Sequence, residues 1–181
     1  MARVPYVDRE EMDTAGQQIY DRIRNDRNAP TVGMQFRAML HSPQAASHLT
    51  SMGAELRFRS ALPADLKELA IIIVAREWNS DIEWTAHAAL AAQAGITAQT
   101  IEAIRTGQDL GGLTQSERVV ASFVYQLLRD KRVADDAFAA AHKLLGTRGV
   151  VDLTLTCGYY TAINMAQIAL KPGMEGKAST L

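Results

Sequence analysis

Residues 62–95, LPADLKELAIIIVAREWNSDIEWTAHAALAAQAG, constrain the fold more than any other stretch of the chain. Pro63 suits the first turn of a helix, where its missing N–H is not needed, and Asp65 adds negative charge near the positive end of the helix dipole. The residues from Leu69 to Ala75 are apolar without a break, which is typical of a buried helix rather than an amphipathic one. We therefore predict a buried central helix that begins at about Pro63 and extends to Trp78.

A second helix is expected after a short polar break at Asn79 and Ser80. The segment Ser80-Asp81-Ile82-Glu83 has the S-x-x-E form of a capping box, and Gly95 is suited to end the helix after about Ala94. On this helix Glu83 and His87 are four residues apart, so their side chains lie one turn apart on the same face. The pair is therefore expected to share a hydrogen bond.

The order Glu68, Ser80, Glu83, His87 resembles the signature of the carboxymuconolactone decarboxylase/alkylhydroperoxidase D superfamily, in which a glutamate precedes two further site positions and a histidine. In the peroxidase branch the two middle positions are the cysteines of a C-x-x-C motif. Here they are Ser80 and Glu83, so the spacing is kept and the thiols are absent. The segment from Glu68 to Ile96 is similar in sequence to the decarboxylase-like branch, and a looser similarity extends from about Gly33 to Tyr160.

The resemblance implies that Glu68, Glu83 and His87 are catalytic, and we expect them to line a common cleft between the two helices. Direct proton transfer requires that His87 lie within hydrogen-bond reach of a carboxylate, or one water away. Each residue also has a simpler explanation. Glu68 could be a charge in the first helical turn, Glu83 a capping residue, and His87 a core histidine satisfied by a carboxylate.

Other side chains are weaker candidates for contacts with a substrate. Ser80 is first of all a helix-capping residue, and Trp84 would help to keep the site partly dry. Arg76 and Tyr159 could contact a carboxylate or carbonyl group, as could Arg37 and Tyr160, although surface or core roles explain each of them better.

These residues favour a carboxymuconolactone decarboxylase-like lyase, or a proton-transfer enzyme, that acts without a cofactor on a small unsaturated or cyclic organic acid. Decarboxylation leaves an electron pair that must be delocalised and then protonated at carbon, and His87 could supply the proton. One alternative is an alkylhydroperoxidase-like antioxidant protein, which needs a thiolate and a resolving thiol. Another is a non-catalytic oligomeric binding protein on the same scaffold. No metal is expected, because Glu83 and His87 give two ligands where three or more are usual.

The rest of the chain also predicts helices. An extended arm over residues 1–9 precedes an amphipathic helix from Arg9 to about Asn25, a short apolar helix over 33–40, and a helix from Pro43, capped by Ser42, to about Arg59. Further helices are expected from Thr97 to Arg105, after a capping box at Thr114 and Glu117, from Asp135 to Leu145, and from Arg148 to Leu170. The last is apolar on nearly every side and predicts a second buried helix. With no alternating segment typical of a strand, the fold is predicted to be all-α, with a central buried helical hairpin.

The composition and the distribution of charge limit the kinds of molecule that the protein is expected to bind. The net charge is −1 and the basic residues are dispersed, so no surface for nucleic acid or anionic membrane is indicated. No apolar stretch approaches the roughly 20 residues that span a bilayer, and the first residues lack an apolar signal region, so a cytoplasmic protein is expected. The single cysteine, Cys157, lies in an apolar, Tyr-rich segment where it is expected to pack as a small hydrophobic residue.

A chain of 181 residues with 48% hydrophobic residues is expected to form one compact domain. We expect an N-terminal arm and helix over 1–30, a decarboxylase-like helical domain over 31–175, and a flexible tail over 176–181. Two nearly wholly apolar helices carry more apolar surface than one small subunit covers, which favours a homo-oligomer. The resemblance implies a homotrimer or homohexamer.

Overall fold

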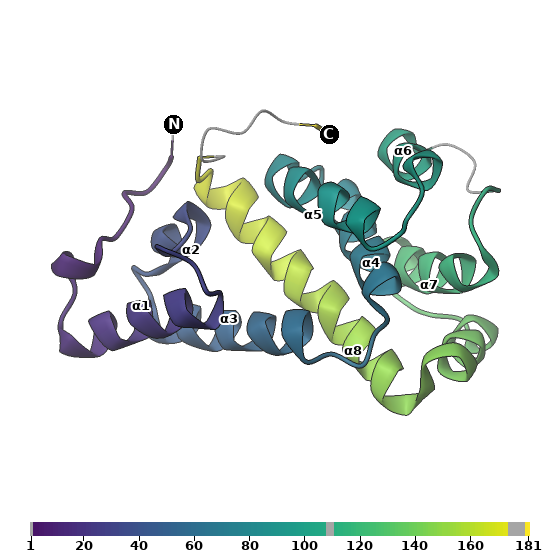
Figure 1. Ribbon diagram of the computed structural model, residues 1–181, viewed down its shortest axis with the longest axis horizontal. Coiled ribbons are helices and arrows are strands. Elements are labelled where there is room, and N and C mark those ends of the chain that lie inside the picture. Colours follow the sequence, from purple (N-terminus) through teal and green to yellow (C-terminus); the bar gives the residue numbers. More distant parts are fainter. Residues whose placement is uncertain (1, 108–110, 174–179) are drawn as a thin grey trace. The chain divides into compact units, whose positions relative to one another are not determined.

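The computed structural model describes residues 2–107, 111–173 and 180–181, and these residues form helices and their connections, with no strand among them (Figure 1). The all-α prediction is therefore confirmed. The chain forms two compact units, Met1–Arg59 with Met165–Ala178 and Ser60–Asn164 with Ser179–Leu181. The division expected at residues 30 and 175 stays a prediction, and residues 176–179 of the expected tail lie outside the described part.

Among its described residues, the first unit contains four short or medium helical segments and the end of a fifth. They are the 3-10 turn η1 (Arg9–Glu11), α1 (Thr14–Asp26), α2 (Met34–Met39), α3 (Pro43–Phe58) and the last residues of α8. Asp13 accepts a hydrogen bond from the Gly16 N–H, so α1 begins at Thr14 rather than at Arg9 as predicted. Pro43 occupies the first turn of α3 as predicted, but the Ser42 side chain makes no capping hydrogen bond.

The second unit is built around α4 (Ala64–Glu77), which packs against three other helices: α5 (Asp81–Gln93), α6 (Ala98–Thr106) and α7 (Gln115–Tyr125). Figure 1 shows α4 and α5 side by side. All seven residues from Leu69 to Ala75 are 0% exposed, which confirms the predicted buried central helix. A short π-helix (Gln126–Asp130) follows α7, and most of α8 (Asp135–Leu170) completes the unit.

Local stop and start signals account for the ends of α5 and α7. Gly95 has φ 106°, and the N–H groups of Gly95 and Ile96 donate to the carbonyls of Ala92 and Ala91, which is a Schellman termination. At the start of α7 the predicted capping box between Thr114 and Glu117 is present in both directions. The sequence therefore predicted these ends correctly.

Gly146, with φ 70° and ψ 176°, breaks α8 at the position where two separate helices were predicted. Beyond the break one face is buried, with Leu153 and Cys157 at 0% and 1% exposure. The opposite face is open, because Val151 is 51% and Leu155 is 45% exposed. The prediction of a wholly buried helix is therefore wrong for the single subunit. Within the described ranges, no helix is long and apolar enough to cross a membrane.

Candidate functional site

The connection between α4 and α5 places Glu68 opposite His87. Asn79 adopts φ 48°, a left-handed conformation that asparagine tolerates better than most residues, and this reverses the chain after Trp78. Glu68 and His87 each lie about two to three helical turns from the connection, so the hairpin brings them to the same level.

The imidazole of His87 lies between two carboxylates. Its Nδ1 is 2.6 Å from Glu68 Oε2, and its Nε2 is 3.4 Å from Glu83 Oε2. The first contact has the length of a strong, charge-assisted hydrogen bond, whereas the second is longer than a well-formed one. The structure thus brings both carboxylates to the His87 ring, as expected, and the catalytic roles of the three residues stay a prediction.

The site is enclosed rather than open. The side chain of His87 is 3% exposed, that of Glu83 is 8% and that of Glu68 is 12%. The histidine is therefore buried, rather than exposed in the open cleft that was expected. Glu68 is the member of the group that solvent reaches most easily.

Burial by itself lowers the pKa of His87, because it penalises the charged form. The hydrogen bonds to Glu68 and then Glu83, together with the charges of both carboxylates, outweigh burial and raise the pKa of His87 above its ordinary value. These surroundings therefore favour the imidazolium form more strongly than water does. In that form the Nδ1–H donates to Glu68, and the Nε2–H is held only loosely by Glu83.

Aromatic rings line the histidine. The Tyr160 ring, on α8, meets the His87 ring edge to face at 5.0 Å between centroids, and Tyr159 packs edge to face on Tyr160, also at 5.0 Å. Tyr159 therefore reaches the site through Tyr160. Trp84 is buried, at 1% exposure, and its predicted role of keeping the site dry stays a prediction.

Ser80 and Glu83 do not form the predicted capping box. The Ser80 side chain makes no capping hydrogen bond, although Ser80 occupies the N-cap position of α5. The Ser80 N–H donates instead to the Ala75 carbonyl at 2.9 Å, so the Glu83 carboxylate is not needed there. Glu83 lies against His87 instead.

The two arginine candidates have structural partners. Arg76 lies two turns beyond Glu68 on α4, and its guanidinium donates to the Arg105 carbonyl at 2.7 Å and to Asn79 Oδ1 at 2.5 Å. Arg37, in the first unit, forms an ion pair with Asp8. Neither arginine is shown beside the histidine.

Two residues of α8 were missed by sequence reasoning. Thr156 Oγ1 and both amide atoms of Asn164 have no hydrogen-bond partner in the described part of the chain, and both residues are 0% exposed. They lie four residues before and four residues after Tyr160, on the same helix face. The available signal was two polar residues at this spacing around a tyrosine in an otherwise apolar segment.

Cys157 is buried and has no sign of an activated thiol. Burial raises the pKa of Cys157 to about 12, and the residue is 1% exposed, as its predicted packing role requires.

The three side chains do not form a metal site. Glu68 and Glu83 approach different ring nitrogens of His87, so their oxygen and nitrogen atoms do not surround one point at which a metal ion could bind. Among the residues that the structure describes, no group of three His, Cys, Asp or Glu side chains could hold a metal ion.

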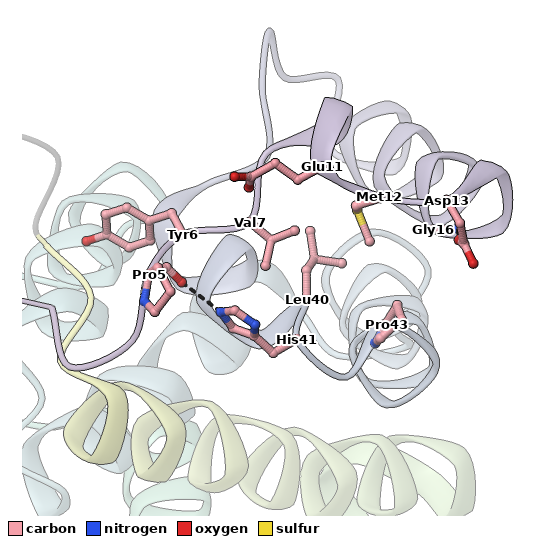
Figure 2. A pocket seen from close by; sticks show the side chains of 10 residues that line it. All are labelled: Pro5, Tyr6, Val7, Glu11, Met12, Asp13, Gly16, Leu40, His41 and Pro43. Carbon is pink, nitrogen blue, oxygen red and sulfur yellow. Dashed lines mark hydrogen bonds between the residues drawn. The ribbon is translucent and has the colours of Figure 1, made fainter.

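A hollow of about 470 Å³ lies in the first unit, between the N-terminal arm and the helices α1 and α3. Figure 2 shows that its polar side chains, Tyr6, Glu11 and Asp13, point in different directions. His41 is 2.9 Å from the Pro5 carbonyl, and Asp13 caps α1. The hollow therefore contains none of the predicted site residues, and these polar groups serve local structure.

The chain resembles known proteins in sequence and in fold. Residues 43–124, slightly less than half of the chain, match the model of the carboxymuconolactone decarboxylase family, which supports the resemblance read from the sequence. The match includes α3 to α6 and nearly all of α7. No curated protein is similar enough to the chain to count as a match.

The crystal structure of ATU0492, a protein of unknown function from Agrobacterium tumefaciens, has a similar fold, with a TM-score of 0.64 and 16% sequence identity. The similarity covers 72% of this chain and 90% of that one. That protein is described as a candidate antioxidant defence protein, AhpD. At this identity the likeness concerns the fold, which is the AhpD-like helical fold predicted from the sequence.

Proposed function

We propose that the protein is a cofactor-independent proton-transfer enzyme of the decarboxylase type, acting on a small unsaturated or cyclic organic acid. The observation that carries the proposal is the buried imidazole of His87 between the carboxylates of Glu68 and Glu83, at 2.6 Å and 3.4 Å. A buried histidine with a raised pKa, held between two carboxylates by a tight hairpin, is an arrangement suited to acid–base catalysis.

The proposed reaction has one bond-breaking and one bond-forming step. The bond between the substrate's carbon and its carboxylate breaks, carbon dioxide leaves, and the electron pair is delocalised into a conjugated carbonyl group. The Nε2–H of His87 then delivers its proton to carbon. The neutral imidazole regains a proton from water, which the two flanking carboxylates favour.

The two carboxylates have different roles in this proposal. Glu68 holds Nδ1 at 2.6 Å and fixes the orientation of the ring, so it is a positioning residue. Glu83 contacts Nε2 at 3.4 Å, a length that leaves the Nε2–H available to a substrate. Nε2 is therefore the reacting atom.

The test is turnover of small unsaturated cyclic acids in deuterium oxide, followed by release of carbon dioxide and by deuterium at the product carbon. His87→Gln should lower the rate by about 10²–10⁴-fold, the usual contribution of a general acid. His48→Gln, an exposed histidine on α3, is the matched control and should keep the wild-type rate. An acid that binds to His87 without turnover would favour the non-catalytic binding protein, and a wild-type rate in His87→Gln would exclude the mechanism.

An antioxidant role is the second candidate, because the Agrobacterium tumefaciens protein is described in those terms. We expect no reduction of hydroperoxides with dithiol reductants, since Ser80 and Glu83 occupy the positions of the thiols. Cys157, with its pKa raised to about 12, supplies almost no thiolate at neutral pH. The measurement is peroxide consumption by wild type and Cys157→Ser. Consumption that disappears in Cys157→Ser would establish the antioxidant function instead.

We propose further that a second copy of this chain covers the open face of α8 formed by Val151 and Leu155. Two large aliphatic side chains four residues apart, at 51% and 45% exposure, form an apolar patch of the kind found at subunit interfaces. A homotrimer or homohexamer would bury this patch.

Val151→Lys with Leu155→Lys is expected to shift the protein to monomers in light scattering after size-exclusion chromatography. Two charges would be buried unpaired in the interface, whereas in a free subunit they would remain in water. Gln115→Lys, an exposed site on α7, controls for added charge. An unchanged molar mass in the double variant would exclude this face as the contact.

A further inference from the structure

The face of α8 that meets His87 carries polar groups that the fold leaves unsatisfied. Tyr160 contacts the His87 ring, and Asn164 lies four residues further along the helix, about 6 Å along its axis. Both amide atoms of Asn164 are buried without a hydrogen-bond partner among the described residues. Because buried amides are almost always hydrogen-bonded, such a group next to a candidate site indicates a missing ligand.

Thr156 has an unpartnered hydroxyl on the same face, but it differs from Asn164 in one respect. A threonine hydroxyl in a helix can satisfy itself by donating to the carbonyl four residues earlier, as Thr154 does toward Val150 and Thr50 toward Ala46. A small rotation of Thr156 would achieve this. An asparagine amide in mid-helix has no equivalent local solution for both its donor and its acceptor, so Asn164 is the group that needs a partner from outside the helix.

The charges beside this face limit what the partner is. Two carboxylates, those of Glu68 and Glu83, already flank His87, so a further anionic group placed against them would be repelled. An uncharged carbonyl group avoids that repulsion and accepts a hydrogen bond from the Asn164 Nδ2. It is also the group that takes up the electron pair in a proton transfer at carbon.

We propose that Asn164 forms a subsite for an uncharged carbonyl group of the ligand, so that the carbonyl is held on α8 while the neighbouring carbon faces His87. The subsite rests on the proposed function for the chemistry of its ligand, although its existence as a binding site does not. In catalysis the Asn164 N–H would stabilise the negative charge that develops on the carbonyl oxygen.

The experiment titrates the full-length protein with three probes of one ring size: cyclopent-2-enone, cyclopent-1-ene-1-carboxylate and cyclopentylammonium. Binding is followed by the nitrogen-15 shift of the Asn164 side-chain amide and by calorimetry. The uncharged enone should bind more tightly than the ammonium ion, and Asn164→Leu should weaken enone binding about tenfold, the value of one well-made hydrogen bond. The carboxylate resembles the acid of the proposed function, so it can bind at His87, but its affinity should not depend on Asn164. A carboxylate that loses affinity in Asn164→Leu as the enone does, or an enone that keeps its affinity, would overturn the assignment.

Thr156→Val is the matched control, because it removes an equally buried and unpartnered group from the same face two turns away. It should leave enone affinity unchanged. Asn164→Leu should raise the melting temperature of the free protein by about 1–4 °C, since it replaces an unsatisfied polar group by an apolar one. A lower melting temperature in Asn164→Leu would show that the amide is bonded within the fold, and equal loss of affinity in Thr156→Val would remove the site from Asn164.

His87→Gln separates this inference from the proposed function. Enone binding that is retained in His87→Gln and lost in Asn164→Leu supports the subsite whether or not any acid is turned over. Turnover that depends on His87 but not on Asn164 would overturn the subsite and leave the proposed function in place.

Discussion

Replacing His87 by alanine is expected to lower the free energy of unfolding by about 3–5 kcal/mol, as for other buried ion pairs that lose one partner. The reason is the environment of the ring. Alanine would leave the carboxylates of Glu68 and Glu83, at 12% and 8% side-chain exposure, without the cation between them. Denaturation in urea measures the loss, which corresponds to a fall in melting temperature of roughly 6–20 °C.

Two further variants show whether the carboxylates are the cause. His48→Ala, at an exposed position of α3, should have little effect. Adding Glu68→Gln and Glu83→Gln to His87→Ala should recover much of the lost stability, because the uncompensated charges are then gone. If His87→Ala alone unfolds at the wild-type urea concentration, the histidine does not hold these charges in place.

The stability of the protein is also expected to fall as pH rises above the ordinary pKa of histidine, about 6.5. The pKa of His87 in the folded protein is raised above its ordinary value, so the folded state binds this proton more tightly than the unfolded chain does. The resulting stabilisation is fully present below the unfolded pKa of about 6.5 and is lost as pH rises through the raised folded pKa. Urea unfolding between about pH 5.5 and 9 measures this slope.

Glu68→Gln should move that loss to lower pH, because it removes the stronger hydrogen bond and one negative charge from the imidazolium. Glu77→Gln is the control on the same helix, where the carboxylate pairs with Arg129 instead. Nuclear magnetic resonance of the His87 ring nitrogens gives the titration directly. An identical His87 titration in wild type and Glu68→Gln would contradict the assignment of Glu68 as its principal partner.

Much of the fold was readable because its helices are marked by local chemistry. A run of seven apolar residues, Leu69 to Ala75, predicts a helix that is buried on every side, as observed. Helix ends at Gly95 and Gly146 follow from the positive φ that glycine adopts easily, and the start of α7 follows from the Thr114–Glu117 capping box. The meeting of Glu68, Glu83 and His87 also follows from spacing along a tight hairpin.

What the sequence could not predict depends on contacts between distant segments. The S-x-x-E pattern at Ser80 is identical to a true capping box, and only the approach of His87 and the Ala75 carbonyl shows that Glu83 is used elsewhere. Arg76 was similarly ambiguous, and Asn164 was missed altogether. The hydrogen bond of Arg76 to the Arg105 carbonyl and the missing partners of Asn164 are set by tertiary packing.

The way α5 begins has a consequence for how such a site can change over evolutionary time. The start of this helix includes a backbone contact from the Ser80 N–H to the Ala75 carbonyl, and the Ser80 side chain makes no capping hydrogen bond. The turn between the two helices therefore does not depend on an S-x-x-E capping box. A lineage built on this scaffold can change the residue types at positions 80 and 83 without losing a cap that the hairpin needs.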